Sequence, residues 1–180
     1  METSPALQPA LTRPDLLAAP VAAALAGWPA GAAATEVAPI DPELADTAAF
    51  CAHYGVALAD SANCVVVAAR RGGTTTYAAC LVTAVSRADV NGLVRRHLDA
   101  RKASFAPVDD VLAATGMQYG GITPIGLPAD WPVLVDAAVA AHPRVVVGSG
   151  IRGSKLWLPG ALLAALPTAT VLDGLGLPVG

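Results

Sequence analysis

Two glycine-rich stretches stand out in this chain: TGMQYGGITPIG at residues 115–126 and VGSGIRGSK at residues 147–155. Glycine adopts backbone conformations closed to other residues and lets a ligand or another backbone approach without a Cβ in the way. Pro124 removes one N–H donor from the first stretch and fixes one φ. Such loops either bind an anion or oxyanion through backbone amides or serve as plain tight turns. These residues alone leave both interpretations open.

The composition predicts one folded domain. With 54% hydrophobic and 14% charged residues in a chain of 180, disorder over most of the length is excluded. No run approaches the ~18 apolar residues of a membrane span, and the N-terminus lacks the basic segment of a secretory signal. Three cysteines without a CxxC pair and three scattered histidines predict a reduced, cytoplasmic protein without a metal site.

Charge is unevenly distributed along the sequence. The net charge of −3 argues against a generic nucleic-acid binder, but residues 1–60 carry one base and seven acids, whereas residues 61–180 carry ten bases and seven acids. The basic residues of interest in the second part are Arg70, Arg71, Arg95, Arg96, Arg101, Lys102, Arg144, Arg152 and Lys155. They form ordinary solvated surface or, if several share one face, a phosphate-contacting patch.

Hydrophobic periodicity predicts a single compact α+β domain over residues 36–180, preceded by a loosely attached Ala/Pro-rich extension, residues 1–35, with a short helix from Pro14 to about Leu25. Strands are expected at 36–40, 63–69, 75–83, 102–105, 131–136, 144–147, 155–158 and 168–172. Gly72 and Gly73 indicate a hairpin. Helices are expected after an N-cap at Asp41, after a capping box at Ser86–Asp89, at 108–115 and at 159–166. Because no regular βαβ rhythm occurs, we expect a mostly antiparallel mixed sheet with short flanking helices.

Familiar catalytic signatures are absent from the sequence: it contains no G-x-S-x-G elbow, no Walker loop and no HExxH. Cys64 is a candidate nucleophile for a small-molecule thioesterase or amidase. Its place in a valine-rich strand without a basic neighbour favours a buried structural thiol instead.

The segment Gly120-Gly-Ile-Thr-Pro-Ile-Gly126 resembles the GxxxP-containing loop of the YbaK/ProX family. This family includes the editing insertion domain of bacterial prolyl-tRNA synthetases and its free-standing relatives. The resemblance continues through Pro132–Asp136 into a second glycine loop at Val147–Gly153 and spans residues 36 to 172. It implies a mixed α/β editing-domain fold that hydrolyses the ester between a wrong, small amino acid and the tRNA 3′ end, without a metal or organic cofactor.

The resemblance also implies roles for individual residues. Loop amides would hold the aminoacyl carbonyl while water attacks, assisted by the substrate's own ribose hydroxyl. The catalytic candidates are Asn63, Gly120, Gly121 and Pro124, and the substrate-binding candidates are Gly126, Gly148, Ser149, Gly150, Lys102, Arg152 and Lys155. The expected partners are the aminoacyl-tRNA 3′ end and, as a further candidate, a synthetase. Neither DNA nor a membrane is expected, and the protein should be a monomer or weak dimer.

One position departs from the family pattern. Relatives commonly carry a lysine near the start of the first hairpin strand, where this chain has Asn63, which can form hydrogen bonds but carries no charge. Asn63 could orient the substrate in a variant deacylase, or Lys102 or Lys155 could supply the charge. Hydrolysis could also be lost, leaving a silent module that binds tRNA or a synthetase. Asn63 could equally be a simple turn residue at a strand end.

Overall fold

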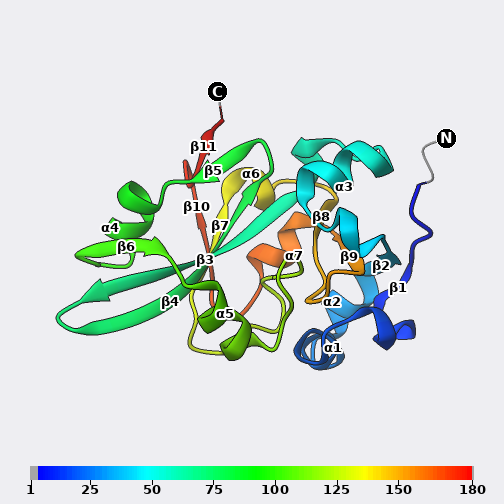
Figure 1. The fold of residues 1–180 in the computed structure, drawn as a ribbon, viewed down its shortest axis with the longest axis horizontal. Coiled ribbons are helices and arrows are strands. Elements are labelled where there is room, and N and C mark those ends of the chain that lie inside the picture. Colours follow the sequence, from blue (N-terminus) through cyan, green and yellow to red (C-terminus); the bar gives the residue numbers. More distant parts are fainter. Residues whose placement is uncertain (1–3, 180) are drawn as a thin grey trace.

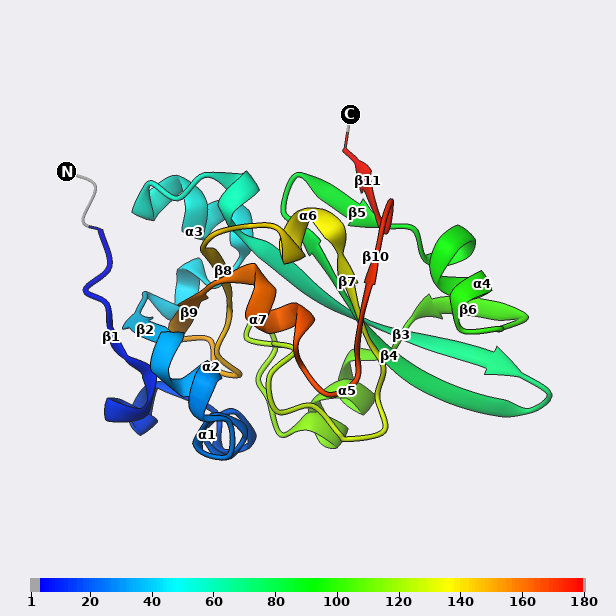
Figure 2. The same cartoon turned by 180° about the vertical axis from the view of Figure 1, so that it is seen from behind.

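Two β-sheets meet along one long hairpin strand in the computed structural model, which describes residues 4–179 (Figures 1 and 2). One sheet has the order β1-β2-β9-β8, the other β10-β7-β4-β3-β6, and β11 pairs with β5. A parallel bridge between Ser61 and Val146 joins the start of β3 to β8. β7 runs parallel to β4 and β10, while the remaining strand pairs are antiparallel. The predicted mixed, mostly antiparallel α+β fold is therefore confirmed.

The strands are β1 (Gln8–Pro9), β2 (Glu36–Pro39), β3 (Ala62–Arg71), β4 (Thr74–Thr83), β5 (Ser86–Ala88), β6 (Lys102–Phe105), β7 (Val133–Asp136), β8 (Val145–Gly148), β9 (Ser154–Leu158), β10 (Ala169–Leu172) and β11 (Gly176–Pro178). The helices are α1 (Ala19–Ala26), α2 (Pro29–Ala34), α3 (Thr47–Tyr54), α4 (Arg95–His97), α5 (Val108–Thr115), α6 (Ala137–Ala140) and α7 (Gly160–Ala164). A π-helical turn, Val90–Val94, leads into α4. Among the described residues, no helix is long and apolar enough to cross a membrane.

The β3–β4 hairpin projects from the body of the molecule (Figure 1). Its register runs without interruption from the pair Ala62–Thr83 to the pair Arg71–Thr74. Gly72 and Gly73 form the turn with φ of 56° and 78°, values that suit the tight hairpin turns whose twist matches that of the strands. The predicted hairpin is confirmed.

The prediction of a loosely attached N-terminal extension is wrong for the described part of residues 1–35. Val21 and Leu25 on α1 are fully buried and belong to the largest core cluster, together with β7, β8 and β9 side chains. The Ala18 amide donates to the Ser149 carbonyl at 3.2 Å. The expected helix from Pro14 is instead a 3₁₀ turn, Pro14–Leu16, followed by α1 with Pro20 in its first turn, a position where proline needs no N–H partner.

Two predicted caps also need correction. Asp41 caps only the 3₁₀ turn Pro42–Leu44, whereas Asp46 caps α3 by accepting from the Ala48 and Ala49 amides. Ser86 lies in β5 and is not part of a capping box, and Asp89 alone accepts from the Gly92 and Leu93 amides. In both places an aspartate side chain satisfies the free amides at the start of the helical segment.

Replacing Leu25 by alanine should lower the free energy of unfolding by about 2–5 kcal/mol, because the change leaves a cavity in the main core. Leu11→Ala, at a side chain 40% exposed in the same N-terminal segment, should change it by no more than about 0.5 kcal/mol. Denaturant unfolding of both variants measures the difference. Equal small effects would mean that residues 4–35 are dispensable for the fold.

Candidate functional site

The two glycine loops pack directly against each other. The Gly150 amide donates to the Gly121 carbonyl at 2.7 Å, and the Gln118 amide donates to the Gly150 carbonyl at 2.8 Å. A Cβ added at Gly121 would lie 2.6 Å from the Ile151 backbone, and one at Gly148 would lie 2.5 Å from the Gly121 oxygen. Glycine is required here because backbone contacts backbone.

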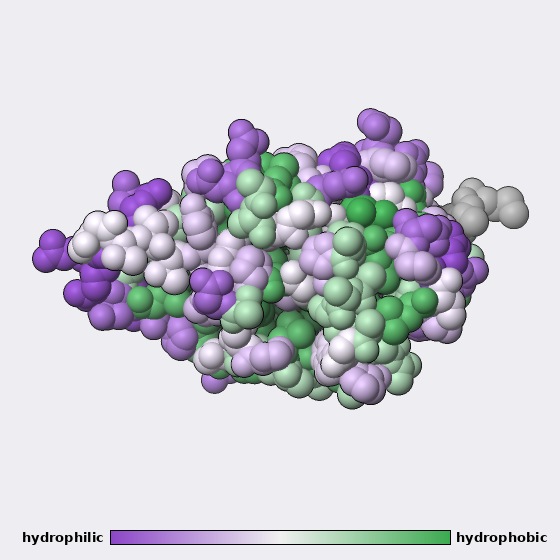
Figure 3. Space-filling view, turned by 90° about the horizontal axis from the view of Figure 1, so that it is seen from below, coloured by the Kyte–Doolittle hydropathy of each residue, from purple (hydrophilic) through white to green (hydrophobic). Residues whose placement is uncertain are grey.

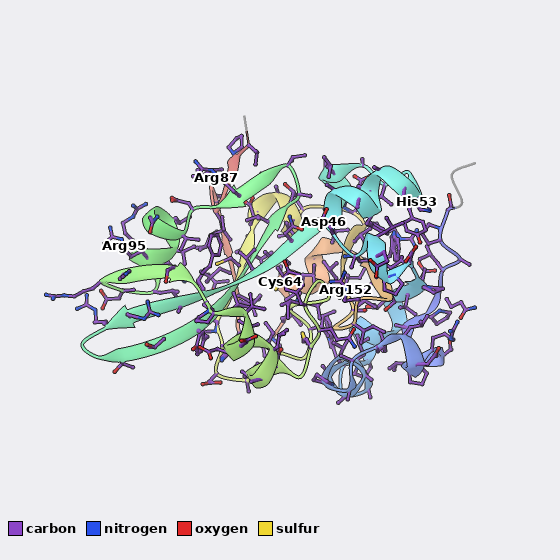
Figure 4. The ribbon with its side chains drawn as sticks, viewed as in Figure 1. Asp46, His53, Cys64, Arg87, Arg95 and Arg152 are labelled. Atoms are coloured by element: carbon purple, nitrogen blue, oxygen red, sulfur yellow. The ribbon has the colours of Figure 1, made fainter. Side chains whose placement is uncertain are left out.

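A cavity of about 700 Å³ opens beside these loops, bounded by α3, the start of β3, the end of β6 and α5. Its polar lining includes Glu43, Asp46, Thr47, Asn63, Arg152 and Lys155, and its other lining includes Cys64, Val66, Phe105, Val108, Val111, Tyr119, Gly120, Ile122 and Gly148. In Figure 4, Asp46, Cys64 and Arg152 lie in the middle of the molecule, whereas Arg95 lies at its far end.

Asn63 is held in a defined orientation by α3. The Thr47 hydroxyl donates to Asn63 Oδ1 at 2.7 Å, and Asp46 fixes this end of α3 through its cap. With its oxygen engaged, the half-buried Asn63 amide retains Nδ2 as its donor. Asn63 therefore presents a hydrogen-bond donor and not a flexible turn side chain.

Lys155 places a buried amine in the wall of the cavity. The residue is only 6% exposed. Its Nζ donates to the Ala45 carbonyl at 3.0 Å and lies 5.5 Å from the centre of the Phe50 ring. Burial lowers the pKa of Lys155, and the neighbouring Cys51 and Asp46 only partly offset this effect.

Arg152 is a clamp between loops. Its backbone N–H donates to Gln118 Oε1 at 2.9 Å, and its guanidinium donates to the carbonyls of Tyr119 and Pro42, both at 3.0 Å. The carbonyl contacts hold the first glycine loop beside the chain that precedes α3. These contacts also use much of the hydrogen-bond donor capacity that Arg152 was expected to offer to a phosphate.

The structure thus brings five predicted residues to one cavity: Asn63, Gly120, Gly148, Arg152 and Lys155. Five other candidates do not line the cavity: Gly121, Pro124, Gly126, Ser149 and Gly150. Gly126 illustrates their part, since an added Cβ would lie 2.5 Å from the Pro20 oxygen. Lys102 lies elsewhere, beside the hairpin tip.

Several lining residues were not among the sequence candidates. Thr47 and Asp46 carry a helix-start pattern that predicts a cap but not a contact with Asn63. Phe105 and Tyr119 are 66% and 64% exposed, unusual for aromatic side chains beside a cavity. Their exposure could not be read from the sequence because it depends on where β6 and the loop end.

Cys64 lines the cavity, but its chemistry does not suit a nucleophile. Burial raises the pKa of its thiol far above the usual range, and burial raises the pKa of Cys80 to about 12. A thiol must lose its proton to become a strong nucleophile. In the described residues no group of three or more His, Cys, Asp or Glu side chains is arranged to hold a metal ion.

Comparison with known proteins defines the class. The sequence profile of the aminoacyl-tRNA editing domain matches residues 41–166, so the chain belongs to this family. A comparison with curated protein sequences gave no match.

Solved structures share the fold. A candidate trans-editing enzyme for prolyl-tRNA synthetase superposes with a TM-score of 0.74 at 22% identity, over 91% of this chain and 97% of that one. A scaffold used for computational epitope grafting gives a TM-score of 0.74 at 23% identity over the same shares. The hypothetical protein APE2540 gives 0.69 at 18% identity, over 78% and 90%. At such identities these likenesses establish the fold alone.

Replacing Gly120 by alanine should remove most activity at this cavity. Gly120 has φ of 84°, and an added Cβ would lie 2.7 Å from Arg152 Nη1, so the change pushes the clamp aside. Gly174→Ala is the control, because Gly174 has φ of 74° and nothing within 4 Å. Each should cost about 1–2 kcal/mol of stability, but only Gly120→Ala should lose editing activity. Equal activities would show that the clamp is unimportant.

Proposed function

We propose that the protein is a trans-editing deacylase, which hydrolyses the ester of a tRNA mischarged with a small amino acid. The observation that carries this proposal is the cavity itself: the two glycine loops within the matched family segment meet at a pocket that contains Asn63 and the buried Lys155. A pocket of this size suits an amino acid together with the terminal adenosine to which it is esterified.

Stabilisation of the oxyanion is assigned to the first glycine loop. The Gly121 and Gly150 amides are already engaged, donating to Gln118 and Gly121 carbonyls. Among the described residues, the amides of Gly120 and Ile122 make no hydrogen bond within the protein, and both residues line the cavity. Donors fixed in advance at the developing charge are among the largest contributions to catalysis. Water attacks the ester carbonyl, and the adjacent ribose hydroxyl of the substrate assists with the proton.

Lys155 is the residue that supplies positive charge in place of the usual family lysine. It reaches the cavity from β9, whereas Asn63 reaches it from β3. Lys102, the other candidate, is at the far end of β6 from the cavity. In this arrangement Asn63 Nδ2 binds the substrate and Lys155 stabilises the negative charge that forms on the carbonyl oxygen.

Removal of a small amino acid after it has been attached to the wrong tRNA is chemically reasonable. A synthetase pocket gains only about 1–3 kcal/mol of discrimination per methylene group, so small amino acids are charged to the wrong tRNA and must be removed later. The ester of an aminoacyl-tRNA is already activated. Positioning and oxyanion stabilisation therefore suffice without a protein nucleophile.

A deacylation screen tests the proposal. Purified protein is mixed with tRNAs carrying labelled Ala, Ser, Thr, Cys or Pro, and ester loss is compared with the spontaneous rate. We expect selective acceleration for one small amino acid, and Asn63→Ala and Asn63→Asp should each reduce it on the order of 10²-fold, because both remove the Nδ2 donor. Binding of aminoacyl-tRNA without faster ester hydrolysis would instead show that the protein is a tRNA-binding module without catalysis. This alternative arises because Asn63 stands where relatives commonly carry a lysine.

The pH dependence of turnover tests the role of Lys155. A lowered pKa in the folded state means that turnover above the spontaneous rate should fall as the pH rises through that pKa, below the ordinary value of 10.5. The unfolded chain binds this proton more tightly, so the free energy of unfolding should rise with pH across the same window. In Lys155→Met the free energy of unfolding should rise less with pH, because the titrating amine is gone. This variant should also lose most turnover at every pH. An unchanged pH–rate profile in Lys155→Met would exclude Lys155 from the reaction.

A further inference from the structure

A basic surface lies at the free end of the β3–β4 hairpin, outside the cavity. Residues 70–102 contain seven basic residues and two acidic ones, a net charge of +5, although the whole chain carries −3. Six of the basic residues gather here: Arg70 and Arg71 beside the hairpin turn, Arg101 and Lys102 at the start of β6, and Arg95 and Arg96 on α4. In the space-filling view, hydrophilic side chains gather at this end among paler ones (Figure 3), and Figure 4 places Arg95 on this side of the molecule.

Four of these residues surround a shallow hollow of about 250 Å³. Arg70, Arg71, Arg101 and Lys102 line it together with the turn glycines and the exposed Thr74 and Thr75. The strand register sets Arg70 directly opposite Lys102, and the Arg101 amide donates to the Arg70 carbonyl at 2.9 Å. Arg71 is partly neutralised by Asp99 at 2.6 Å. A hollow with clustered cations, hydroxyls and a glycine turn suits phosphate groups.

The sheet connects this surface to the cavity. Side chains alternate along a strand, so Arg70 shares a face of β3 with Cys64 and Val66, which line the cavity. On β6, Lys102 belongs to the basic surface and Phe105 to the cavity rim, three residues or about 10 Å apart. Phe105 exposes 66% of its surface at the cavity rim.

The charge of the rest of the molecule favours one orientation for a polyanion. Residues 1–60 carry a net −6, and β1 and β2 of this segment lie at the opposite end from the hairpin tip (Figure 1). A polyanion is therefore repelled from one end and attracted to the other. Asp110 on α5, which accepts from the Tyr77 hydroxyl at 3.3 Å, marks the edge of the basic surface on the side of α5.

We propose that Arg70, Arg101 and Lys102, with Arg71, bind the phosphate backbone of the RNA acceptor end while its 3′ terminus occupies the cavity. The strand spacing makes the surface reachable within a few nucleotides of the terminal adenosine. This inference rests on the proposed function because that function places the 3′ end of the RNA in the cavity. Binding at the basic surface itself does not require hydrolysis. The partner is an RNA backbone; an anionic lipid surface is the competing occupant.

The test compares two triple variants with the same change in net charge. Arg70→Gln/Arg101→Gln/Lys102→Gln removes the basic surface. Arg13→Gln/Arg87→Gln/Arg144→Gln removes three arginines outside it, two of which form exposed ion pairs with Asp15 and Glu36. Affinity for uncharged tRNA is measured at several salt concentrations. Turnover is measured on aminoacyl-tRNA and on an aminoacylated adenosine without a phosphate.

We expect the first variant to bind tRNA on the order of tenfold to hundredfold more weakly, with a log–log salt slope smaller by about 2–3, because each phosphate contact contributes about 0.7–0.9 to that slope. It should lose kcat/KM on full tRNA but not on the aminoacylated adenosine, which carries no phosphate for the basic surface to bind. The control variant should retain wild-type behaviour on both substrates.

Other results would overturn the proposal. Equal weakening in both variants would mean that only net charge matters. Unchanged tRNA binding, with loss of binding to phosphatidylserine vesicles, would assign the surface to lipid. If no protein hydrolyses any ester, the proposed function fails, while the salt slopes for uncharged tRNA still decide whether this surface binds RNA.

Discussion

Backbone-to-backbone contact between the two glycine loops is the constraint on which the site depends. Gly148 and Gly121 approach so closely that neither tolerates a Cβ, and the Gly150 amide closes the contact with a 2.7 Å hydrogen bond. The loops consequently share one rigid wall, and the Arg152 clamp ties it to the chain before α3. An oxyanion site benefits from such rigidity because its donors need no rearrangement during the reaction.

Glycines that look alike in the sequence have different roles in the structure. Gly120 lines the cavity, whereas Gly121, Gly126 and Gly150 permit close packing behind it. Gly126 and Gly150 contact the N-terminal segment at Pro20 and Ala18. The N-terminal segment is thus part of the support for the site, and the apolar side chains of α1 also belong to the main core.

Sequence patterns predicted most of the longer strands because β-branched runs such as Val65–Val67 and Val145–Val147 satisfy local preferences and burial together. They did not predict the short strands β1, β5 and β11 or the division into separate sheets. They failed for the N-terminal segment, since an alanine-rich helix shows little periodicity and Val21 and Leu25 alone carry its burial. The site residues contributed by the two glycine loops and Asn63 were predicted through family resemblance. The burial of Lys155, the Thr47–Asn63 contact and the clamp by Arg152 depend on long-range packing that no local pattern encodes.

In the proposed function, the aminoacyl end of the RNA sits in the cavity against Gly120 and Ile122. Titration of ¹⁵N-labelled protein with an adenosine that carries a small amino acid through an amide, which the protein cannot hydrolyse, tests this placement. We expect saturable shifts of the Gly120 and Ile122 amide signals and of the Asn63 side-chain amide, with little change at Gly72 and Gly73. Shifts confined to other surfaces, with the cavity signals unmoved, would contradict it.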